Sequence, residues 1–260
     1  MVRLEGCKGS VGVFDSGVGG ISVLKALVRE LPGEDFAFYG DSAHNPYGEK
    51  RPEEVLALSQ DIVGGLLDSG CKAVVIACNT ATSAAAARLR EDYPKTPIIG
   101  VEPALKPAAL SQPNGRVLVL ATPLTVRLDK FQRLLRTWEG ESHVIAVPCE
   151  GLAARIERGD LHAPDLYELL ERLVGPYAGS VDAVVLGCTH YPFVREQLEQ
   201  ILGDVPFFDS ADGTARQLRR RLAQSHLLSE RTSGGKVRFF SSSQDDPAEL
   251  ELYRSFFELA

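Results

Sequence analysis

The sequence lacks the features that mark membrane-spanning, secreted and nucleic-acid-binding proteins. No apolar run approaches the roughly 20 residues that a membrane-spanning helix needs, and the first residues contain no apolar core of a signal peptide. The net charge of −7 and the absence of a long basic run argue against broad binding of nucleic acid or of a membrane surface. These absences predict a cytoplasmic protein whose partner is a small molecule.

Motifs for metals and nucleotide cofactors are also missing. The five cysteines have no zinc-type spacing, and Cys71 and Cys78 are too far apart for a C-x-x-C redox pair. In a reducing compartment we expect free thiols, with Cys7 and Cys71 acting as small buried hydrophobes. The glycine-rich turn at residues 17–20 lacks G-x-G-x-x-G spacing, and no G-x-x-x-x-G-K-[ST] occurs. We therefore expect no metal and no cofactor.

What the sequence does contain is one short phrase that occurs twice. Residues 73–80 read AVVIACNT and residues 183–190 read AVVLGCTH, so each apolar run stops at a cysteine. Such a run predicts a strand buried on both faces of a parallel sheet. In open α/β sheets, ligands bind just beyond the carboxyl ends of the strands. The repeat therefore predicts that Cys78 and Cys188 lie at two strand tips and face one small molecule from opposite sides.

The two halves of the chain follow the same plan. Apolar strands alternate with helical patterns, which predicts parallel α/β sheets. Asp15 and Thr122 each end the first strand of a half, and the cysteines follow 63 and 66 residues later (78 − 15 and 188 − 122). This spacing predicts an α/β fold of two pseudo-symmetric lobes, each a mostly parallel sheet flanked by helices. The active site is then expected in the cleft between the lobes.

We expect residues 1–101 together with 208–260 to form the first lobe, and residues 102–207 to form the second. The stretch from residue 205 to 241 has no counterpart before residue 115, and we expect it to pack on the first lobe. The predicted strands are 11–14, 36–39, 73–77, 97–101, 115–121, 144–147, 183–187 and 236–241. The predicted helices are 21–31, 52–68, 81–92, 128–137, 166–177, 193–202 and 212–224.

Two opposed thiols suit proton transfer. A thiol has an ordinary pKa of about 8.5, and its neighbours can tune it to act as a general base or acid. One thiolate can remove a proton from one face of a carbon while the other thiol delivers a proton to the opposite face. Asp15 and His190 are the candidate partners of the thiols, although His190 could instead cap the turn before Pro192. Neutral groups at the same rim suit the carboxylate and ammonium groups of a ligand: Ser16, Asn79, Thr80, Thr122 and Thr189.

Four motifs together resemble those of a known family. They are FDSGVGG at 14–20, PYG at 46–48, ACNTA at 77–81 and LGCTHYP at 186–192. In this order and spacing they resemble the glutamate racemases of the aspartate/glutamate racemase superfamily, over residues 12–209. The resemblance implies a cofactor-independent isomerase that interconverts L- and D-glutamate and supplies D-glutamate for peptidoglycan synthesis. It also implies a bacterial cytoplasmic enzyme that forms a homodimer.

The resemblance assigns roles to single residues. It implies that Cys78 and Cys188 are the catalytic bases, one for the α-proton of each enantiomer, with Asp15 assisting Cys78 and His190 assisting Cys188. Glu157 matches a carboxylate with an assisting role in some members, although residues 150–155 are atypical, and His44 stands where arginine is frequent. The implied substrate-binding residues are Asp15, Ser16, Tyr47, Gly48, Asn79, Thr80, Thr122, Thr189 and His190.

Two other functions fit part of the pattern. A sibling racemase could use the same thiols on aspartate or a hydantoin, although Tyr47 and Gly48 with the two cysteine motifs favour glutamate. A non-catalytic amino-acid binder of the two-lobed periplasmic type is the second alternative, and the missing signal peptide argues against it. Only about ten residues precede the first strand, so we expect no control by a cell-wall precursor of the kind found in members with a long N-terminal extension.

Overall fold

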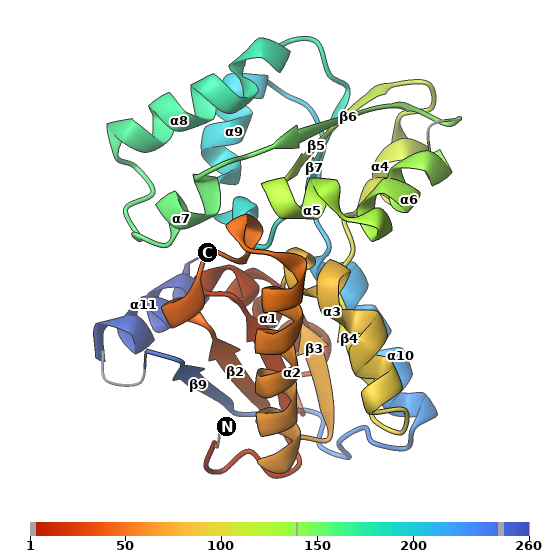
Figure 1. Cartoon of the computed structure of the whole chain (residues 1–260), viewed down its shortest axis with the longest axis vertical. Coiled ribbons are helices and arrows are strands. Elements are labelled where there is room, and N and C mark those ends of the chain that lie inside the picture. The colour runs from red at the N-terminus through yellow and green to blue at the C-terminus, as the bar shows by residue number, and fades with distance from the viewer. Residues whose placement is uncertain (1–3, 139, 244–246, 260) are drawn as a thin grey trace.

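The strands form two parallel sheets. The computed structural model describes residues 4–138, 140–243 and 247–259, and every strand pair within them is parallel. Figure 1 shows one sheet above the other, each flanked by helices. The predicted α/β class with two helix-flanked parallel sheets is confirmed.

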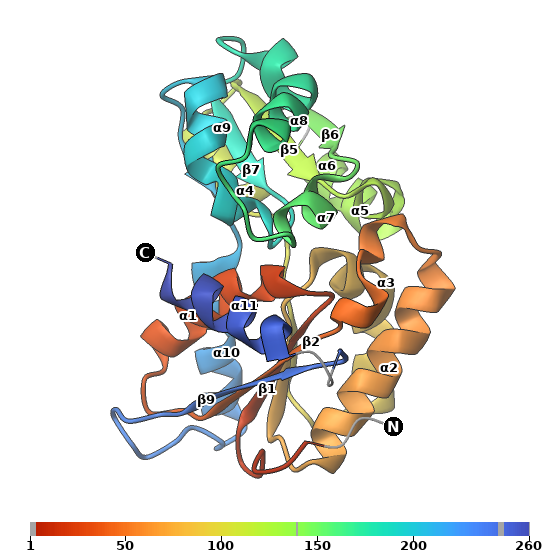
Figure 2. The same ribbon diagram turned by 90° about the vertical axis from the view of Figure 1, so that its left-hand side faces the viewer.

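The first sheet has the strand order β4-β3-β1-β2-β9. Its central strands are continuous apolar runs whose residues are all buried, as a sheet covered on both faces requires. Helices α1, α10 and α11 cover one face, and α2 and α3 cover the other (Figure 2). The bounds are β1 (Val11–Asp15), β2 (Phe36–Gly40), β3 (Ala73–Ile76), β4 (Ile98–Gly100), β9 (Val237–Ser241), α1 (Ile21–Glu30), α2 (Pro52–Asp68), α3 (Asn79–Asp92), α10 (Ala211–Gln224) and α11 (Pro247–Glu258).

The second sheet has the order β6-β5-β7-β8. Side chains on one face of β5 and β7 pack with α4 and α6, whereas those on the other face pack with α8 and α9. The bounds are β5 (Arg116–Ala121), β6 (His143–Pro148), β7 (Ala183–Leu186), β8 (Phe207–Phe208), α4 (Leu105–Ser111), α5 (Pro123–Arg127), α6 (Asp129–Trp138), α7 (Leu152–Ile156), α8 (Pro164–Val174) and α9 (Arg195–Leu202).

The two sheets share one topology. Reading β4-β3-β1-β2 against β8-β7-β5-β6 pairs each strand with its counterpart, so β3 and β7, which precede the two cysteines, occupy equivalent places. The prediction that the stretch from residue 205 lacks a counterpart was wrong for β8, which pairs with β7 as β4 pairs with β3. Farther along, α10 packs against α1 and β9 pairs with β2, as expected for the first sheet.

Several element bounds differ from the predicted ones for local reasons. The turn before α6 contains a separate helix α5, because Thr122 caps it and Pro123 stands at its first position. Helix α8 ends at Val174 rather than at residue 177, because Pro176 follows and cannot donate to a continuing helix. Helices α4 and α11 were not among the predicted elements. No helix of the described chain is long and apolar enough to span a membrane.

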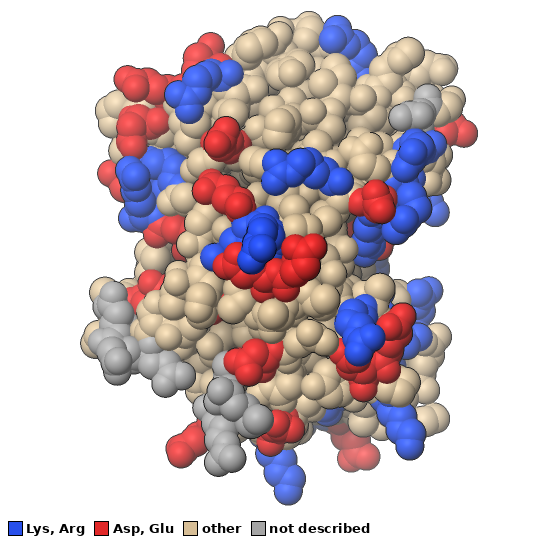
Figure 3. Space-filling view, in the orientation of Figure 1, with Lys and Arg blue, Asp and Glu red and all other residues tan. Residues whose placement is uncertain are grey.

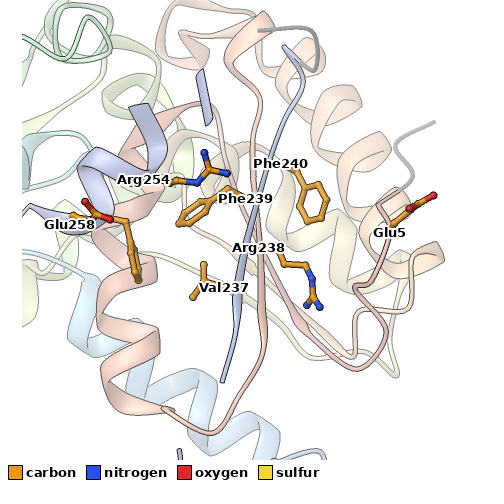
Figure 4. Close-up of a pocket in the computed structure, with 8 residues that line it drawn as sticks. Glu5, Val237, Arg238, Phe239, Phe240, Arg254 and Glu258 are labelled. Atoms are coloured by element: carbon orange, nitrogen blue, oxygen red, sulfur yellow. The ribbon is translucent and has the colours of Figure 1, made fainter. Parts of the chain in front are cut away.

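Two surface hollows lie away from the cysteine strand tips. A cavity of about 570 Å³ runs along the edge strand β9, where the side chains of Val237 and Phe239 point to one side and those of Arg238 and Phe240 to the other (Figure 4). A groove of about 1120 Å³ lies between the edge strands β4 and β8. Charges of both signs are interspersed over the face drawn in Figure 3. Neither hollow is lined by Cys78 or Cys188.

Candidate active site

The carboxyl ends of the two sheets face each other, and hydrogen bonds join them. The hydroxyl of Thr189 donates to Oδ2 of Asp15 (3.0 Å), and the hydroxyl of Ser22 lies 2.8 Å from the carbonyl oxygen of Thr189. The backbone N–H of Val18 donates to Oε1 of Glu157 (2.9 Å). These bonds bring the tip of β1 and the start of α1 against the segments that follow β7 and α7.

Cys78 lies two residues after the end of β3 and is the N-cap residue of α3. The N–H of Ala81 donates to its sulfur (3.4 Å), and the hydroxyl of Ser16 lies 3.9 Å from that sulfur. Burial raises the pKa of the Cys78 thiol most, and the charges of Asp15 and Cys188 raise it further, whereas the bonds from Ala81 and Ser16 lower it. The thiol is therefore protonated at neutral pH.

Cys188 follows β7 and contacts a buried histidine. Its sulfur lies 3.6 Å from Nδ1 of His190, and Nε2 of His190 lies 2.5 Å from Oε1 of Glu157. Burial alone would lower the pKa of His190, but its bonds to Cys188 and Glu157 and the charge of Glu157 raise that pKa well above the ordinary value. The imidazole is therefore cationic. Its side chain caps no helix end, so the capping alternative was wrong.

The absence of a side chain at Gly17 leaves room for the carboxylate of Glu157 beside His190. A Cβ at Gly17 would overlap the carboxylate of Glu157, which comes from the far side of the site. The N–H of Gly17 instead donates to Oδ1 of Asp15 (2.9 Å). Asp15 is completely buried at the end of β1, and burial is the main reason that its pKa is raised to about 6. The nearby His190 and the bonds from Gly17 and Thr189 act in the opposite direction.

Three threonine hydroxyls meet on the other side of the site. Oγ1 of Thr80 lies 2.9 Å from Oγ1 of Thr122 and 3.0 Å from Oγ1 of Thr125, and Thr122 donates to Thr125 (2.9 Å). Thr80 lies in α3, which flanks the first sheet, whereas Thr122 and Thr125 lie at the start of α5, which follows β5 of the second sheet. Thr125 was not singled out in the sequence, although its place three residues after Thr122 puts both on one helix face. Asn79 lies beside this group, and neither polar atom of its buried amide has a partner in the described part of the chain.

The loop after β2 completes the rim. The hydroxyl of Tyr47 donates to the carboxylate of Asp41 (2.5 Å), and Gly48 lies so close to Thr122 that a Cβ would come 2.6 Å from the threonine Cβ. Asp41 was also missed in the sequence. The signal was present, because Asp41 directly follows the buried strand β2, at the same sheet edge as Asp15, the last residue of β1.

The structure therefore gathers the predicted site residues at one place between the sheets. All five cysteines are free, as expected, and all five are buried. Cys7 and Cys71 belong to the hydrophobic core between the first sheet and α2. Glu157, whose role was open, contacts His190 directly. A pair of thiols, one beside a carboxylate and one beside an imidazolium, can exchange protons with a ligand held between them.

Comparison with known proteins agrees with this geometry. The family model described as Asp/Glu/Hydantoin racemase matches residues 11–218. A curated glutamate racemase of Clostridium perfringens is 45% identical over 251 residues, covering 96% of each chain, and one of Stutzerimonas stutzeri is 47% identical over 92% of this chain and 90% of its own.

Solved structures agree as well. The glutamate racemase of Francisella tularensis in complex with D-glutamate superposes with a TM-score of 0.82 at 27% identity, covering 96% of this chain and 94% of that one. The Escherichia coli glutamate racemase in complex with L-glutamate and the activator UDP-MurNAc-ala gives 0.80 at 30% identity, covering 96% and 95%. The chain thus belongs to the Asp/Glu/Hydantoin racemase family and is an isomerase of the racemase type.

Proposed function

We propose that this racemase interconverts L- and D-glutamate by moving protons at Cα between the thiols of Cys78 and Cys188. The observation that carries the proposal is the equivalent placement of the two cysteines after β3 and β7, on either side of the hydrogen bond by which Thr189 donates to Asp15. The names of the curated relatives and the glutamate bound in two similar structures support glutamate as the substrate.

The Cys188 side holds a cationic partner for the reacting sulfur. The cationic His190, 3.6 Å from the sulfur, balances a negative charge there, and Glu157 holds the imidazole in place from behind. The Cys188 thiolate takes the α-proton from one enantiomer and becomes a thiol. The Cys78 thiol then gives its proton to the opposite face of Cα and becomes the thiolate.

The reverse direction starts from a thiolate at Cys78. The start of α3 favours that charge through the N–H of Ala81 and the helix dipole, whereas an ionised Asp15 opposes it. Protonation of Asp15 removes this opposition, and its pKa of about 6 makes the change accessible near neutral pH. We assign Asp15 to Cys78 and His190 to Cys188 on this basis.

Neutral groups at the rim bind the substrate in this proposal. The unpartnered amide of Asn79 supplies a donor and an acceptor that a bound amino acid would satisfy. Hydroxyls and backbone N–H groups recognise the two carboxylates without a fixed positive charge that would compete with His190. The proposed binding residues are the neutral Ser16, Tyr47, Gly48, Asn79, Thr80, Thr122 and Thr189, together with Asp15 and His190, which also assist the thiols.

The division into lobes and the cellular role belong to the same proposal. We take residues 1–101 with 208–260 and residues 102–207 as the two lobes that enclose the substrate, with the second crossing at the end of β8, where Phe208 still pairs with Val185 of the second sheet. D-glutamate made in the cytoplasm would serve peptidoglycan synthesis, and we propose a homodimer. Sedimentation velocity of the purified protein tests the dimer; a single monomeric species across the concentration range would contradict it.

Circular dichroism tests the activity itself. Purified protein without added cofactor should convert L-glutamate to a racemic mixture, and it should turn over aspartate more slowly. Faster turnover of aspartate would replace the substrate in this proposal. Cys78→Ser and Cys188→Ser should each abolish racemisation, whereas Cys7→Ser, which changes a buried thiol away from the site, should not. Full racemisation by Cys78→Ser would refute the two-thiol mechanism. Binding of glutamate by the wild-type protein without any racemisation would favour the non-catalytic binder that the sequence left open.

A further inference from the structure

The loop that carries Tyr47 and Gly48 connects β2 to α2, and Asp41 is its first residue. The N–H of Asp41 donates to the carbonyl oxygen of Asp15 (2.9 Å), which ties the start of the loop to the tip of β1. The side chain of Asp41 is buried, with 2% of its surface exposed. A buried carboxylate is costly unless its oxygens accept hydrogen bonds, so its partners show what it holds.

Both oxygens of Asp41 bind side chains of its own loop. Oδ2 accepts the hydroxyl of Tyr47 (2.5 Å), and Oδ1 lies 2.8 Å from Nδ1 of the half-exposed His44. Burial, the charge and bond of Asp41, and the charges of Cys78 and Asp15 all raise the pKa of Tyr47, so its phenol stays protonated and donates. The 3-10 turn that carries Tyr47 also packs against α3, whose N-cap residue is Cys78.

The far end of the loop meets the second sheet. Gly48 and Thr122 approach so closely that no Cβ fits between them, and the 3-10 turn Tyr47–Glu49 packs against α5. Thr122 belongs in turn to the hydroxyl group with Thr80. A shift of the loop would therefore change the rim on both sheets, and Asp41 is the residue that ties Tyr47 to His44 and to the tip of β1.

We propose that Asp41 is a positioning residue for substrate binding, which holds the Tyr47–Gly48 segment against Thr122. This inference rests on the proposed glutamate racemisation. The hydrogen bonds of Asp41 go to Tyr47, His44 and the backbone of Asp15, so it acts on the rim and not on the protons that move. Its loss should therefore weaken the binding of glutamate more than it slows the proton transfer.

Steady-state racemisation of glutamate by four variants tests the inference. Asp41→Ala removes both acceptors, and Tyr47→Phe removes one donor while the ring still fills its buried place. Each should raise KM about tenfold or more, which is the loss expected for one buried charged hydrogen bond, and should change kcat by less than about threefold. Asp41→Asn keeps one acceptor and should give an intermediate KM. Asp61→Asn is the control. It removes an exposed negative charge of α2 that, like the charge of Asp41, raises the pKa of Tyr39, and it should leave KM and kcat unchanged.

Coupling between the two partners separates positioning from general destabilisation. Asp41→Ala combined with Tyr47→Phe should raise KM no more than the worse single change, because both remove the same bond. A KM that stays within about twofold in Tyr47→Phe and Asp41→Ala would overturn the inference, as would losses confined to kcat. Thermal unfolding with and without saturating D-glutamate shows whether each variant is folded. A wild-type protein that does not racemise glutamate would instead refute the proposed function.

Discussion

Replacing Glu157 by glutamine removes one negative charge from the site and little else. Oε1 of Glu157 is the acceptor for both Val18 N–H and His190 Nε2. A glutamine oxygen at the same place can keep both bonds, so Glu157→Gln isolates the effect of the charge on His190. Glu157→Ala removes the charge and both acceptors, which leaves the N–H of Val18 without its partner.

The size of the effect follows from the burial of the pair. His190 is 2% exposed and Glu157 is 15% exposed, so water screens their attraction little. A hydrogen bond between charged groups contributes about 1.5–3 kcal/mol, against about 1 kcal/mol for a neutral one. Loss of the charge therefore removes roughly 1–2 kcal/mol of the free energy by which Glu157 stabilises the protonated His190. This corresponds to an approximately tenfold lower rate when Cys188 is the base.

Racemisation alone cannot locate this loss. The equilibrium constant of a racemisation is one, so kcat/KM is equal in the two directions whatever is mutated. Elimination of HCl from 3-chloroglutamate needs proton abstraction from only one face of Cα, so each configuration at Cα reports on one thiol. The configuration that Cys188→Ser fails to process should be slowed about tenfold by Glu157→Gln, and the other configuration by less than about threefold.

Two further results complete this experiment. Loss of the charge lowers the pKa of His190, so the basic limb of the kcat profile should move to lower pH in Glu157→Gln. Glu150→Gln, an exposed neighbour on the preceding loop, should match the wild type throughout. Equal losses for both configurations, or no loss for either, would refute the assignment of Glu157 and His190 to Cys188.

Two other substitutions probe the same site. Asp15→Asn should make the protein more stable by up to about 3 kcal/mol above about pH 7. Burial raises the pKa of Asp15 to about 6 in the folded protein, against about 3.9 in the unfolded chain. Ionisation of Asp15 therefore lowers the stability of the wild type as the pH rises through these two values, and asparagine avoids this loss. Urea unfolding should show the advantage growing between about pH 4 and about pH 7, and an advantage independent of pH would contradict this origin. Gly17→Ala should displace Glu157 and lower elimination from the Cys188 configuration at least about tenfold. Gly213→Ala is the control, because a Cβ at this position in α10 meets nothing within 4 Å. It should stay active and gain up to about 1 kcal/mol of stability in urea unfolding. Full activity of Gly17→Ala would contradict the prediction, because it would show that the overlap with Glu157 is relieved.

The parts of the fold that were predictable are those with local causes. Continuous apolar runs such as residues 73–77 and 183–187 predict strands covered on both faces, and a polar residue after such a strand lies at the sheet rim where ligands bind. This reasoning placed Asp15, Cys78, Thr122 and Cys188 at strand tips. The two-residue strand β8 escaped it, because a segment that short carries no period of its own.

By itself, the order of residues determined which side chains stand at the ends of strands and that two halves of the chain repeat one plan. Only the tertiary structure decided which of them meet. Glu157 reaches Val18, Thr189 reaches Asp15, and Thr80 reaches Thr122 because the two sheets turn their carboxyl ends toward each other. No periodicity records such contacts, since they join residues of different sheets whose separation along the chain reaches 174 positions; their geometry is set by how the two cores pack.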